Sequence, residues 1–284
     1  MAGAQDKAMV ALPAGAVVVA PGEPIQAALD RLKGSGGVLR LAPGVHTLPE
    51  PLRLPSGVTI AGSGLDCEII LDPKGAGEAA IVNAEPDMHD VTLQDLVIEG
   101  ATTTVVPRDP NSGVGQRRLE YGPIRAGILF QNDGKTSMRN LRLEHITVRN
   151  CTSSAVTLFG VERVRIVNCD ISASGGRVPP GHGKNHNLKL DHIANVSISG
   201  SRFADSMWGH GIAVTFGRDI AVRDCELTRN ALDGVRIAEG RGVTVTECLA
   251  EGNGGNGIAR ETWMDPNQGV ITGRNLLRNN GGGE

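Results

Sequence analysis

Two histidines and an aspartate recur at one place of a sequence repeat, and their side chains are well suited to moving protons. His186, His210 and Asp233 each precede a short apolar segment in three successive repeats. Such residues lie about 4.8 Å apart if the repeats stack as strands. A neighbouring carboxylate orients an imidazole and stabilises its charged form, which suits a general base. We therefore expect these three residues to form one outward column.

Further charged residues alternate outward along the same segments. Lys189 and Arg236 share the third position of the segment, two repeats apart, and Asp191 and Glu261 share the fifth. Elimination or epimerisation of a uronic acid needs a base for the proton next to the carboxylate and a cation for the developing charge. His210 or Lys189 would be the base and Arg236 the carboxylate clamp. The catalytic candidates are thus His186, Lys189, Asp191, His210, Asp233 and Arg236.

Other residues of this region are candidates for holding a substrate. Trp208 precedes His210 by two residues, and an indole provides a face on which a sugar ring stacks. Two insertions, 101–126 and 175–185, enter before the same kind of segment and would wall a groove over it. The substrate-binding candidates are Trp208, His182, His192 and Glu261.

A second chemistry is also open. Glycoside hydrolysis needs two carboxyl groups about 5 to 9.5 Å apart, the wider spacing belonging to inverting enzymes. Asp191 paired with Asp233 or with Asp205 would be an inverting pair. A non-catalytic protein that binds carbohydrate or serves as a structural stem is a third interpretation.

The elements that must position these residues follow from two interleaved repeats. One set of ten-residue segments alternates apolar and polar residues at intervals of about 23 residues, which predicts strands. A second set of short strands runs in step with it, with glycine and asparagine at the corners. The first set starts at Leu141, Val164, Val196, Ile220 and Val243, and the second at Gly127, Ala155, Asn187, Gly211, Gly234 and Gly257. Equivalent strands run the same way, so the pattern predicts a solenoid of parallel sheets.

The repeat and the opening segment 25–46 (IQAALDRLKGSGGVLRLAPGVH) resemble the right-handed parallel β-helix proteins of the pectin-lyase-like superfamily. The resemblance implies an all-β solenoid whose first turn is capped by an amphipathic α-helix, with Ile25, Leu29 and Leu32 on its apolar face. We expect residues 1–16 to be an extension and 17–284 a single domain. The superfamily includes lyases, hydrolases, epimerases, phage tailspikes and non-catalytic proteins, so it implies no one activity.

Two narrower resemblances bear on the chemistry. The stretches 209–211 (GHG) and 235–237 (VRI) are similar to motifs of polygalacturonases, but 185–187 reads NHN where those enzymes carry paired aspartates. His210 and the following Gly-Ile also resemble mannuronan C5-epimerases, whose D-P-H-D motif is replaced by LKLD at 188–191. The sequence therefore favours a carbohydrate-active protein acting on a polysaccharide that contains uronate, by lyase- or epimerase-type proton abstraction.

Composition excludes several other classes. A net charge of −3 over 284 residues gives no electrostatic case for nucleic acid, and no apolar run reaches the 18 residues of a membrane span. Cys169, Cys225 and Cys248 share one repeat position and are expected to stack in the core, since no C-x-x-C metal spacing occurs. We expect no metal site. Calcium is the alternative, disfavoured because the carboxylates are scattered.

The two ends of the chain carry two last expectations. The N-terminal stretch is a poor signal peptide, so the protein is either cytoplasmic or has lost a leader. The second is favoured and predicts a secreted or periplasmic protein. At the other end, 275–284 holds no capping helix and Arg260 replaces an inward apolar residue. An open strand edge invites pairing, so we expect it to be covered by a second copy of the chain or by residues outside this sequence.

Overall fold

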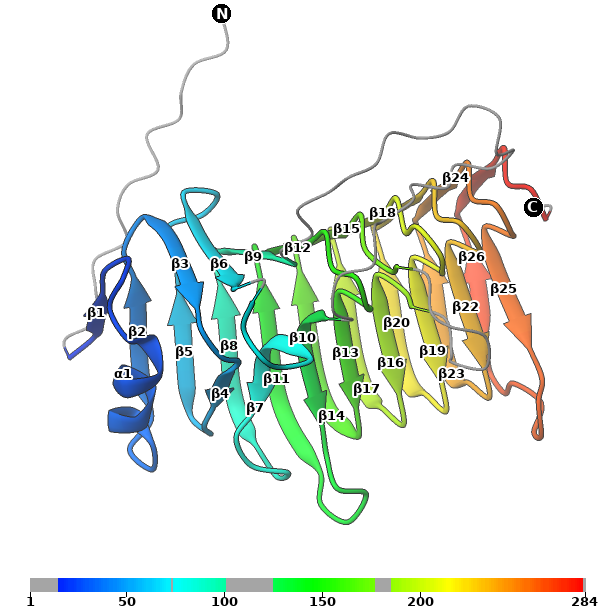
Figure 1. Ribbon diagram of the computed structural model, residues 1–284. Coiled ribbons are helices and arrows are strands. Elements are labelled where there is room, and N and C mark those ends of the chain that lie inside the picture. Colours follow the sequence, from blue (N-terminus) through cyan, green and yellow to red (C-terminus); the bar gives the residue numbers. More distant parts are fainter. Residues whose placement is uncertain (1–14, 73, 101–124, 177–184, 283–284) are drawn as a thin grey trace, which may run out of the picture.

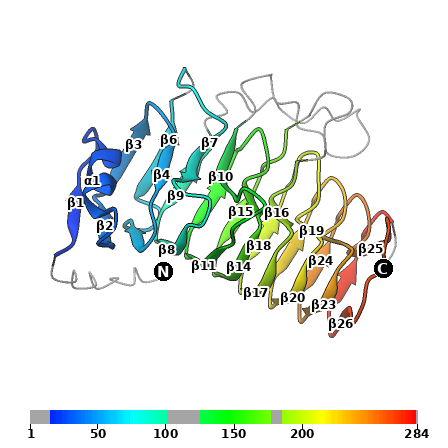
Figure 2. The same cartoon turned by 90° about the horizontal axis from the view of Figure 1, so that it is seen from below.

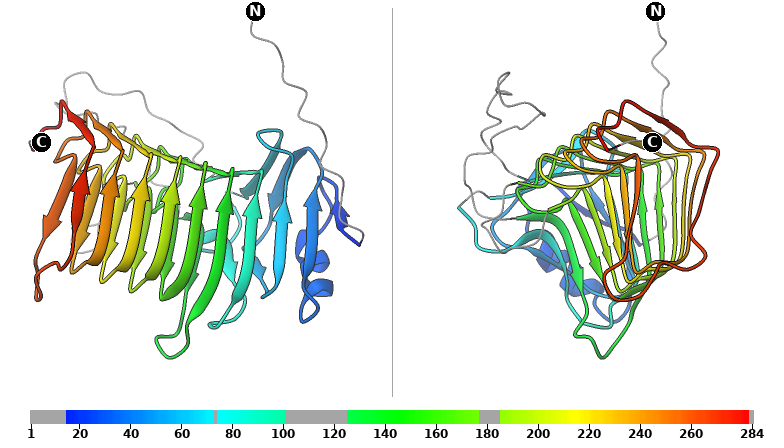
Figure 3. Two further views of the ribbon diagram at one scale, coloured as in Figure 1. Left: turned by 180° about the vertical axis from the view of Figure 1, so that it is seen from behind. Right: turned by 90° about the vertical axis from the view of Figure 1, so that its right-hand side faces the viewer.

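The computed structural model describes residues 15–72, 74–100, 125–176 and 185–282, and these form a right-handed parallel β-helix of three sheets. Figure 1 shows the strands stacked side by side from the helix α1 (Ile25–Leu32) at one end to β25 (Ile258–Glu261) at the other. Seen end-on in Figure 3, successive coils lie over one another. The expected all-β solenoid is confirmed. Among the described residues, no helix is long and apolar enough to cross a membrane.

The three sheets are named A, B and C. Sheet A contains β1 (Val17–Val19), β2 (Gly37–Leu41), β5 (Val58–Ala61), β8 (His89–Gln94), β11 (Met138–Glu144), β14 (Val161–Val167), β17 (Ala194–Ser199), β20 (Arg218–Arg223), β23 (Arg241–Thr246) and β26 (Ile271–Gly273). Sheet B contains β3 (Gly44–Leu48), β6 (Cys67–Leu71), β9 (Val97–Glu99), β12 (Thr147–Arg149), β15 (Asp170–Ser172), β18 (Arg202–Ala204), β21 (Glu226–Thr228), β24 (Leu249–Glu251) and β27 (Leu276–Arg278). Sheet C contains β4 (Leu52–Leu54), β7 (Ala79–Asn83), β10 (Ala126–Gln131), β13 (Val156–Phe159), β16 (Leu188–Asp191), β19 (Ile212–Thr215), β22 (Val235–Ala238) and β25.

The register of sheet C agrees with the second set of predicted strands. Their apolar second positions pair in the order Ile128, Val156, Leu188, Ile212, Val235 and Ile258. All but the last are fully buried, because alternate side chains of a strand point to opposite faces. The position of every outward residue on sheet C follows from this register.

The first set of segments is correct in register and wrong in extent. Leu141, Val164, Val196, Ile220 and Val243 pair in sheet A as expected. Each ten-residue segment is, however, two strands, one in sheet A and the next in sheet B. A single left-handed residue turns the chain between them, such as His145 (φ 54°) or Asn168 (φ 52°). That residue breaks the alternation, which explains why the strand of sheet B was hidden in the pattern.

The interior is a stack of aliphatic residues with few aromatics. Phe130 and Phe203 are the largest fully buried side chains. All five cysteines are buried and unpaired, which confirms the predicted core position of Cys169, Cys225 and Cys248. Burial raises the pKa of the Cys169 thiol to about 11, so this side chain behaves as a small apolar group.

The N-terminal end is covered as expected. Helix α1 buries Ile25, Ala28, Leu29 and Leu32 and contacts β1, β2 and β4. Figure 2, seen from below, places α1 at the opposite end of the molecule from β25 and β26. The predicted division at residue 17 stays a prediction, since residues 1–14 lie outside the described part of the chain.

At the other end, β25, β26 and β27 each have one neighbouring strand in the described part of the chain. Ile271 of β26 and Leu276 of β27 expose more than half of their surface, and Arg260 of β25 is exposed. The Arg260 guanidinium donates to the Thr272 hydroxyl (3.0 Å). An arginine at an inward position is tolerated here because no further coil of the described chain covers it.

Candidate functional site

The predicted column of His186, His210 and Asp233 exists. The two imidazole rings stack with centroids 4.9 Å apart and 27° between their planes. Nδ1 of His210 lies 2.9 Å from Oδ2 of Asp233. The column extends to Ser154 on one side and Asn256 on the other, because each side chain accepts the backbone N–H of the next residue in the column.

The column is not outward, and that part of the expectation is wrong. His186, His210 and Asp233 expose only 6, 4 and 7% of their surface. The physical reason is the ladder itself. Each side chain lies along the axis of the solenoid to reach the N–H group of the next coil, so it does not project into solvent. A buried polar group needs such a partner, since leaving it unpaired would cost about 1–3 kcal/mol.

The hydrogen bonds of the column indicate where its protons lie. Nδ1 of His186 accepts the N–H of His210 (3.2 Å), which leaves the ring proton on Nε2. His210 differs, because its Nδ1 faces both the N–H and the carboxylate of Asp233, at 3.1 and 2.9 Å. These two contacts require opposite tautomers, because a protonated Nδ1 donates to the carboxylate and cannot accept the N–H. We assign the proton to Nδ1, since a bare nitrogen lone pair 2.9 Å from a carboxylate oxygen would be repelled; in this form the ladder bond from the Asp233 N–H is given up. Nε2 of His210 is then the basic atom in the neutral ring.

Asp233 is held in its ionised form. Burial alone would raise its pKa, but hydrogen bonds from His210 and from the backbone N–H of Asn256 outweigh it and hold the pKa of Asp233 below its usual value. The carboxylate against the imidazole orients the ring. The pair is therefore arranged as a base with its orienting group.

The outward face of sheet C carries a second cluster. Nε and Nη2 of Arg236 both lie 2.8 Å from Oε2 of Glu261, and the indole Nε1 of Trp263 donates to the same oxygen (3.2 Å). The guanidinium also stacks on the Trp263 ring at 4.5 Å. Hydrogen bonds from Arg236 lower the pKa of Glu261, and the charge of His210 contributes to the same shift. His210 is therefore close enough to Glu261 to act on its charge, although the column is buried and the cluster lies on the outward face.

Arg236 and Lys189 differ in how far their charges are paired on this face. They are two coils apart with Ala213 between them, as the register predicts. Arg236 exposes only 7% of its surface because Glu261 and Trp263 cover it. Lys189 is half-buried and has no ion-pair partner within the described ranges. Lys189 is therefore the cation here whose charge is not already neutralised.

Asp191 and His192 form a pair at the carboxyl end of β16. Oδ1 of Asp191 lies 2.7 Å from Nδ1 of His192. The imidazole stands between two phenyl rings, with centroids 5.2 Å from Phe159 and 4.7 Å from Phe216. Asp191 is thus occupied by a histidine and does not face the column.

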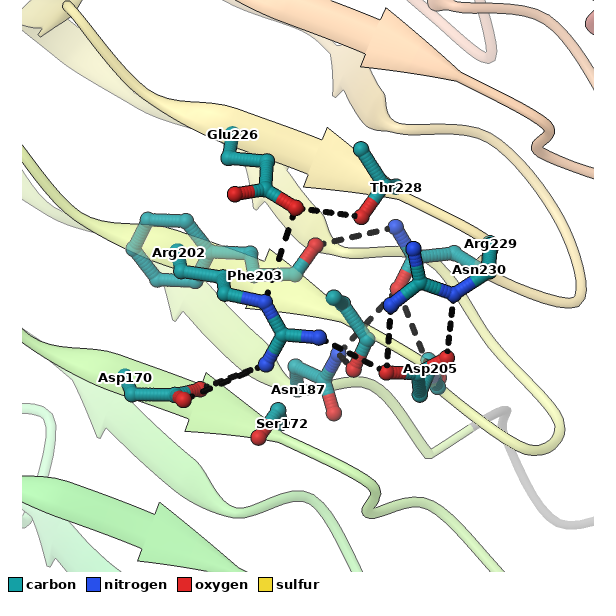
Figure 4. A network of polar contacts seen from close by, with 12 residues as sticks. Asp170, Ser172, Asn187, Arg202, Phe203, Asp205, Glu226, Thr228, Arg229 and Asn230 are labelled. Atoms are coloured by element: carbon teal, nitrogen blue, oxygen red, sulfur yellow. Dashed lines mark hydrogen bonds and ion pairs between the residues drawn. The ribbon is translucent and has the colours of Figure 1, made fainter.

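The carboxylate pairs proposed for hydrolysis are too far apart. Asp191 aligns through Thr215 with Ala238, five residues beyond Asp233 and two coils away. Strand geometry alone makes that separation roughly 14 Å or more, against the 6.5–9.5 Å of an inverting pair. Asp205 follows β18 in sheet B, where Arg202 and Arg229 bind its carboxylate (Figure 4). The expected Asp191–Asp233 and Asp191–Asp205 pairs are therefore wrong.

The remaining candidates fall in different places. Trp208 is half-buried and contacts other groups, and His182 lies outside the described residues together with most of both insertions. Glu261 joins the Arg236 cluster, whereas His192 lies at the far corner of sheet C. Whether the insertions wall a groove over sheet C stays a prediction.

Sequence reasoning missed the residues that hold this face together. Trp263 comes two residues after the end of β25. Its closeness to this strand in the sequence was a usable signal that it lies near the end of sheet C. The Glu239 carboxylate accepts the N–H groups of Trp263, Met264 and Asp265, each at 2.7 Å, and these bonds lower the pKa of Glu239. No spacing in the sequence reveals such a side chain-to-backbone bond.

A bound metal ion needs several side-chain ligands that converge on one point. In the ranges that the structure describes, no three His, Cys, Asp or Glu side chains converge on one point. The expectation that the protein binds no calcium stays a prediction for titration calorimetry.

Known structures resemble this chain over most of its length at low sequence identity. The A-module of the mannuronan C-5 epimerase AlgE4 from Azotobacter vinelandii superposes with a TM-score of 0.56 at 15% identity, over 87% of this chain and 76% of that one. DFA-IIIase from Arthrobacter chlorophenolicus A6, in complex with GF2, gives 0.63 at 16%, over 88 and 61%. Tailspike protein 2 of an Escherichia coli O157:H7 bacteriophage gives 0.59 at 16%, over 92 and 39%. At such identities the likeness shows the fold.

Sequence comparison identifies the family. No curated protein matches the chain by sequence. The family model described as a right-handed beta helix region matches residues 126–283, more than half of the chain and all of the candidate site. The chain therefore belongs to the right-handed β-helix family.

Proposed function

We propose that this protein is an enzyme that acts on a uronate-containing polysaccharide by abstracting a proton from the sugar. The observation that carries the proposal is the contact between His210 and the ionised Asp233, at the start of the sheet C strands whose outward face carries Arg236 and Lys189. The three solved neighbours named above are an epimerase module, DFA-IIIase and a phage tailspike protein, which agrees with a carbohydrate substrate. We expect a secreted or periplasmic location.

The reaction starts at the carbon that bears the carboxylate. Nε2 of His210 takes the C5 proton of the uronate, and the electron pair of the C–H bond delocalises into the carboxylate. Lys189, which has no ion-pair partner among the described residues, stabilises that charge, and Arg236 does so through donors that Glu261 leaves unused. Asp233 stabilises the imidazolium that results.

Two outcomes follow from this carbanion. In elimination, the C4–O bond breaks, its electron pair leaves with the oxygen, which takes a proton from water, and a C4–C5 double bond forms. In epimerisation, a proton returns to C5 from the opposite face and no bond to oxygen breaks. The residues of the site support the shared first step and do not select between the two outcomes.

One observation favours a second candidate function, a non-catalytic carbohydrate-binding protein. The column from Ser154 to Asn256 satisfies its own hydrogen bonds, which is also what a purely structural ladder does. In that case His210 would stabilise the corner of the solenoid and would have no role in turnover.

The test is a screen of polysaccharides, read at the absorbance of unsaturated uronates, by reducing ends and by NMR for epimerised residues. Wild-type protein should act on a uronate polymer, and His210→Asn should reduce turnover by roughly 10²- to 10⁴-fold. Asparagine keeps an acceptor near the position of Nδ1 but lacks Nε2, so it separates the base from the ladder. An unchanged rate in His210→Asn would show that His210 is not the base, and no reaction on any polymer would leave the non-catalytic interpretation.

A further inference from the structure

A trough crosses the corner between sheets C and A, at the carboxyl ends of the sheet C strands. It has a volume of about 520 Å³, within the range of ligand-binding sites. It is lined by residues of six successive coils, from Asn132 after β10 to Asp265 and Pro266 after β25. Five strand spacings of about 4.8 Å give it a length of about 24 Å. We call it the corner trough.

The shape of the corner trough follows from the lengths of the turns. The four central turns between sheets C and A have one or two residues: Gly160, 192–193, 216–217 and 239–240. The turns at the two ends are longer, 132–137 and 262–270. Long turns flanking short ones close both ends of a channel that is open along its side. Such a shape fits a short linear molecule lying along the axis of the solenoid.

The floor of the trough is aromatic. Phe159, His192 and Phe216 form a continuous row across three coils, with ring planes tilted by 46 and 40°. His192 exposes 56% of its side chain, and the two phenyl rings are half-buried. Phe159 and Phe216 are two of the seven Phe, Trp and Tyr residues of the chain. Aromatic C–H and ring surfaces in a polar trough suit the apolar faces of sugar rings.

His192 also presents a polar atom to the trough. The proton of Nδ1 lies toward Asp191, so Nε2 is left as an acceptor for a hydroxyl group. Lys135, Arg218 and Arg241 stand on the rim as cations, and Glu162 and Asp265 as anions. Mixed charges around an aromatic floor match a molecule with many hydroxyl groups better than a strongly charged one.

Both end walls are held in place by carboxylates. The Asp133 carboxylate accepts the N–H groups of Lys135 and Thr136, each at 2.9 Å. Glu239 holds the other wall through three N–H groups of 263–265. The trough is thus preformed, and a ligand would bind without the cost of ordering its walls.

We infer that the corner trough is an oligosaccharide subsite, in which sugar rings lie along Phe159, His192 and Phe216. The inference deepens the proposed function by adding a binding site at the end of β16 opposite to the His210 column, and it does not need the chemistry at His210. A neutral chain and a chain bearing uronates share the ring faces and hydroxyl groups that this floor recognises.

The experiment measures binding of neutral and uronate-containing oligosaccharides on a printed panel, followed by titration calorimetry of those that bind. Phe216→Ala and His192→Ala should each weaken binding at least tenfold. Leu65→Ala removes an exposed apolar side chain far from the trough and should change nothing. His192 is mainly exposed, so its variant keeps the test valid if Phe216→Ala loses stability.

The outcomes separate this inference from the proposed function. His210→Asn should bind as the wild type does, since it removes only the base. Binding of neutral and acidic chains alike assigns recognition to the floor, and binding of acidic chains alone assigns part of it to Lys135, Arg218 and Arg241; either result supports the subsite. Failure of every oligosaccharide to bind, or undiminished affinity in both floor variants, overturns it.

Discussion

Sheets B and C both stack polar side chains on successive coils, and they use them differently. On sheet B, Arg202 contacts Asp170, Asp205 and Glu226 at 3.1, 2.8 and 3.5 Å, and Arg229 contacts Asp205 at 2.8 Å (Figure 4). These charges neutralise one another. Sheet C combines a buried imidazole–carboxylate contact with an exposed indole and with Lys189, a cation that has no ion-pair partner in the part of the chain that the structure describes. A high density of charged side chains is therefore a weak indicator of function. A better indicator is a charged side chain that no protein group neutralises, because it is available to a ligand.

Near the ion pairs of sheet B lies an uncharged ladder, whose first two members, Asn187 and Asn230, are labelled in Figure 4. The amide of Asn187 donates to Asn230, which donates to Asn253, which donates to Asn280. The ladder fixes the corner from which the sheet C strands start. Its amides accept the N–H groups of 206, 230 and 253, whereas the column of His186, His210 and Asp233 lies against the N–H groups of 210, 233 and 256.

The sharpest test of the comparison replaces one aspartate by asparagine at each sheet, Asp233 at sheet C and Asp205 at sheet B. Asp233→Asn removes the charge that orients and stabilises His210, and turnover should fall roughly 100-fold. Asp205→Asn removes an equivalent charge from sheet B and should leave turnover unchanged. Steady-state kinetics on the polymer found by the screen would measure both. Equal losses in the two variants would mean that neither aspartate acts in catalysis.

The ion pairs of sheet B should contribute to the free energy of unfolding. Arg202→Ala should lower the free energy of unfolding by about 1 kcal/mol, since partly exposed pairs in a network contribute about that much. Lys189→Ala on sheet C should have no such effect. Urea unfolding at low and high salt measures both, and the Arg202 effect should shrink as salt screens the charges. A salt-independent loss would contradict the assignment to ion pairs.

Acid should loosen the end of sheet C. The backbone bonds of 263–265 hold the pKa of Glu239 below its usual value. Their stabilising effect is therefore complete above about pH 4.3, the pKa of an unfolded glutamate, and is lost as the pH falls through the lower folded value. Trp263 fluorescence in a Trp208→Phe background should report this change. Glu239→Gln should show the loosened signal at neutral pH as well.

The smallest effect is expected at the last coil of the described chain, where sheets A, B and C end on β26, β27 and β25. We expect weak self-association there, because β26 presents unpaired backbone groups beside an exposed Ile271. Ile271→Lys should shift sedimentation toward the monomer at high protein concentration. Val45→Lys, at an exposed site near the other end, is the matched control. A wild type that is monomeric at every concentration would contradict the expectation.

The sequence predicted the features that recur in successive coils and missed those that depend on a single contact or turn. Leu188, Ile212 and Val235 share a repeat position, so their register could be read from the alternation of apolar residues. The column of His186, His210 and Asp233 followed from the same register. Its burial did not, because the direction of a side chain at a corner depends on which N–H group it can reach. The second strand of each segment was hidden by one left-handed residue, such as His145.

The site was harder to predict than the fold for a related reason. The Arg236 clamp was placed correctly on sheet C, but its partners Glu261 and Trp263 come from the next coil and the turn after it. The distance between Asp191 and Asp233 was misjudged because their offset along the strand was underestimated. Contacts of this kind depend on turn lengths and rotamers, which no periodic pattern encodes.

The short turns along the corner trough have a consequence for how such a protein changes over generations. A coil of the solenoid is a self-contained unit, so duplicating one between the two long turns would keep both end walls and their carboxylate anchors. The channel would grow by one strand spacing, about 4.8 Å, and gain one more floor position. The number of coils between 132–137 and 262–270 therefore sets the length of the ligand that the trough can hold. Duplicating or deleting one coil would change that length and leave both end walls unchanged.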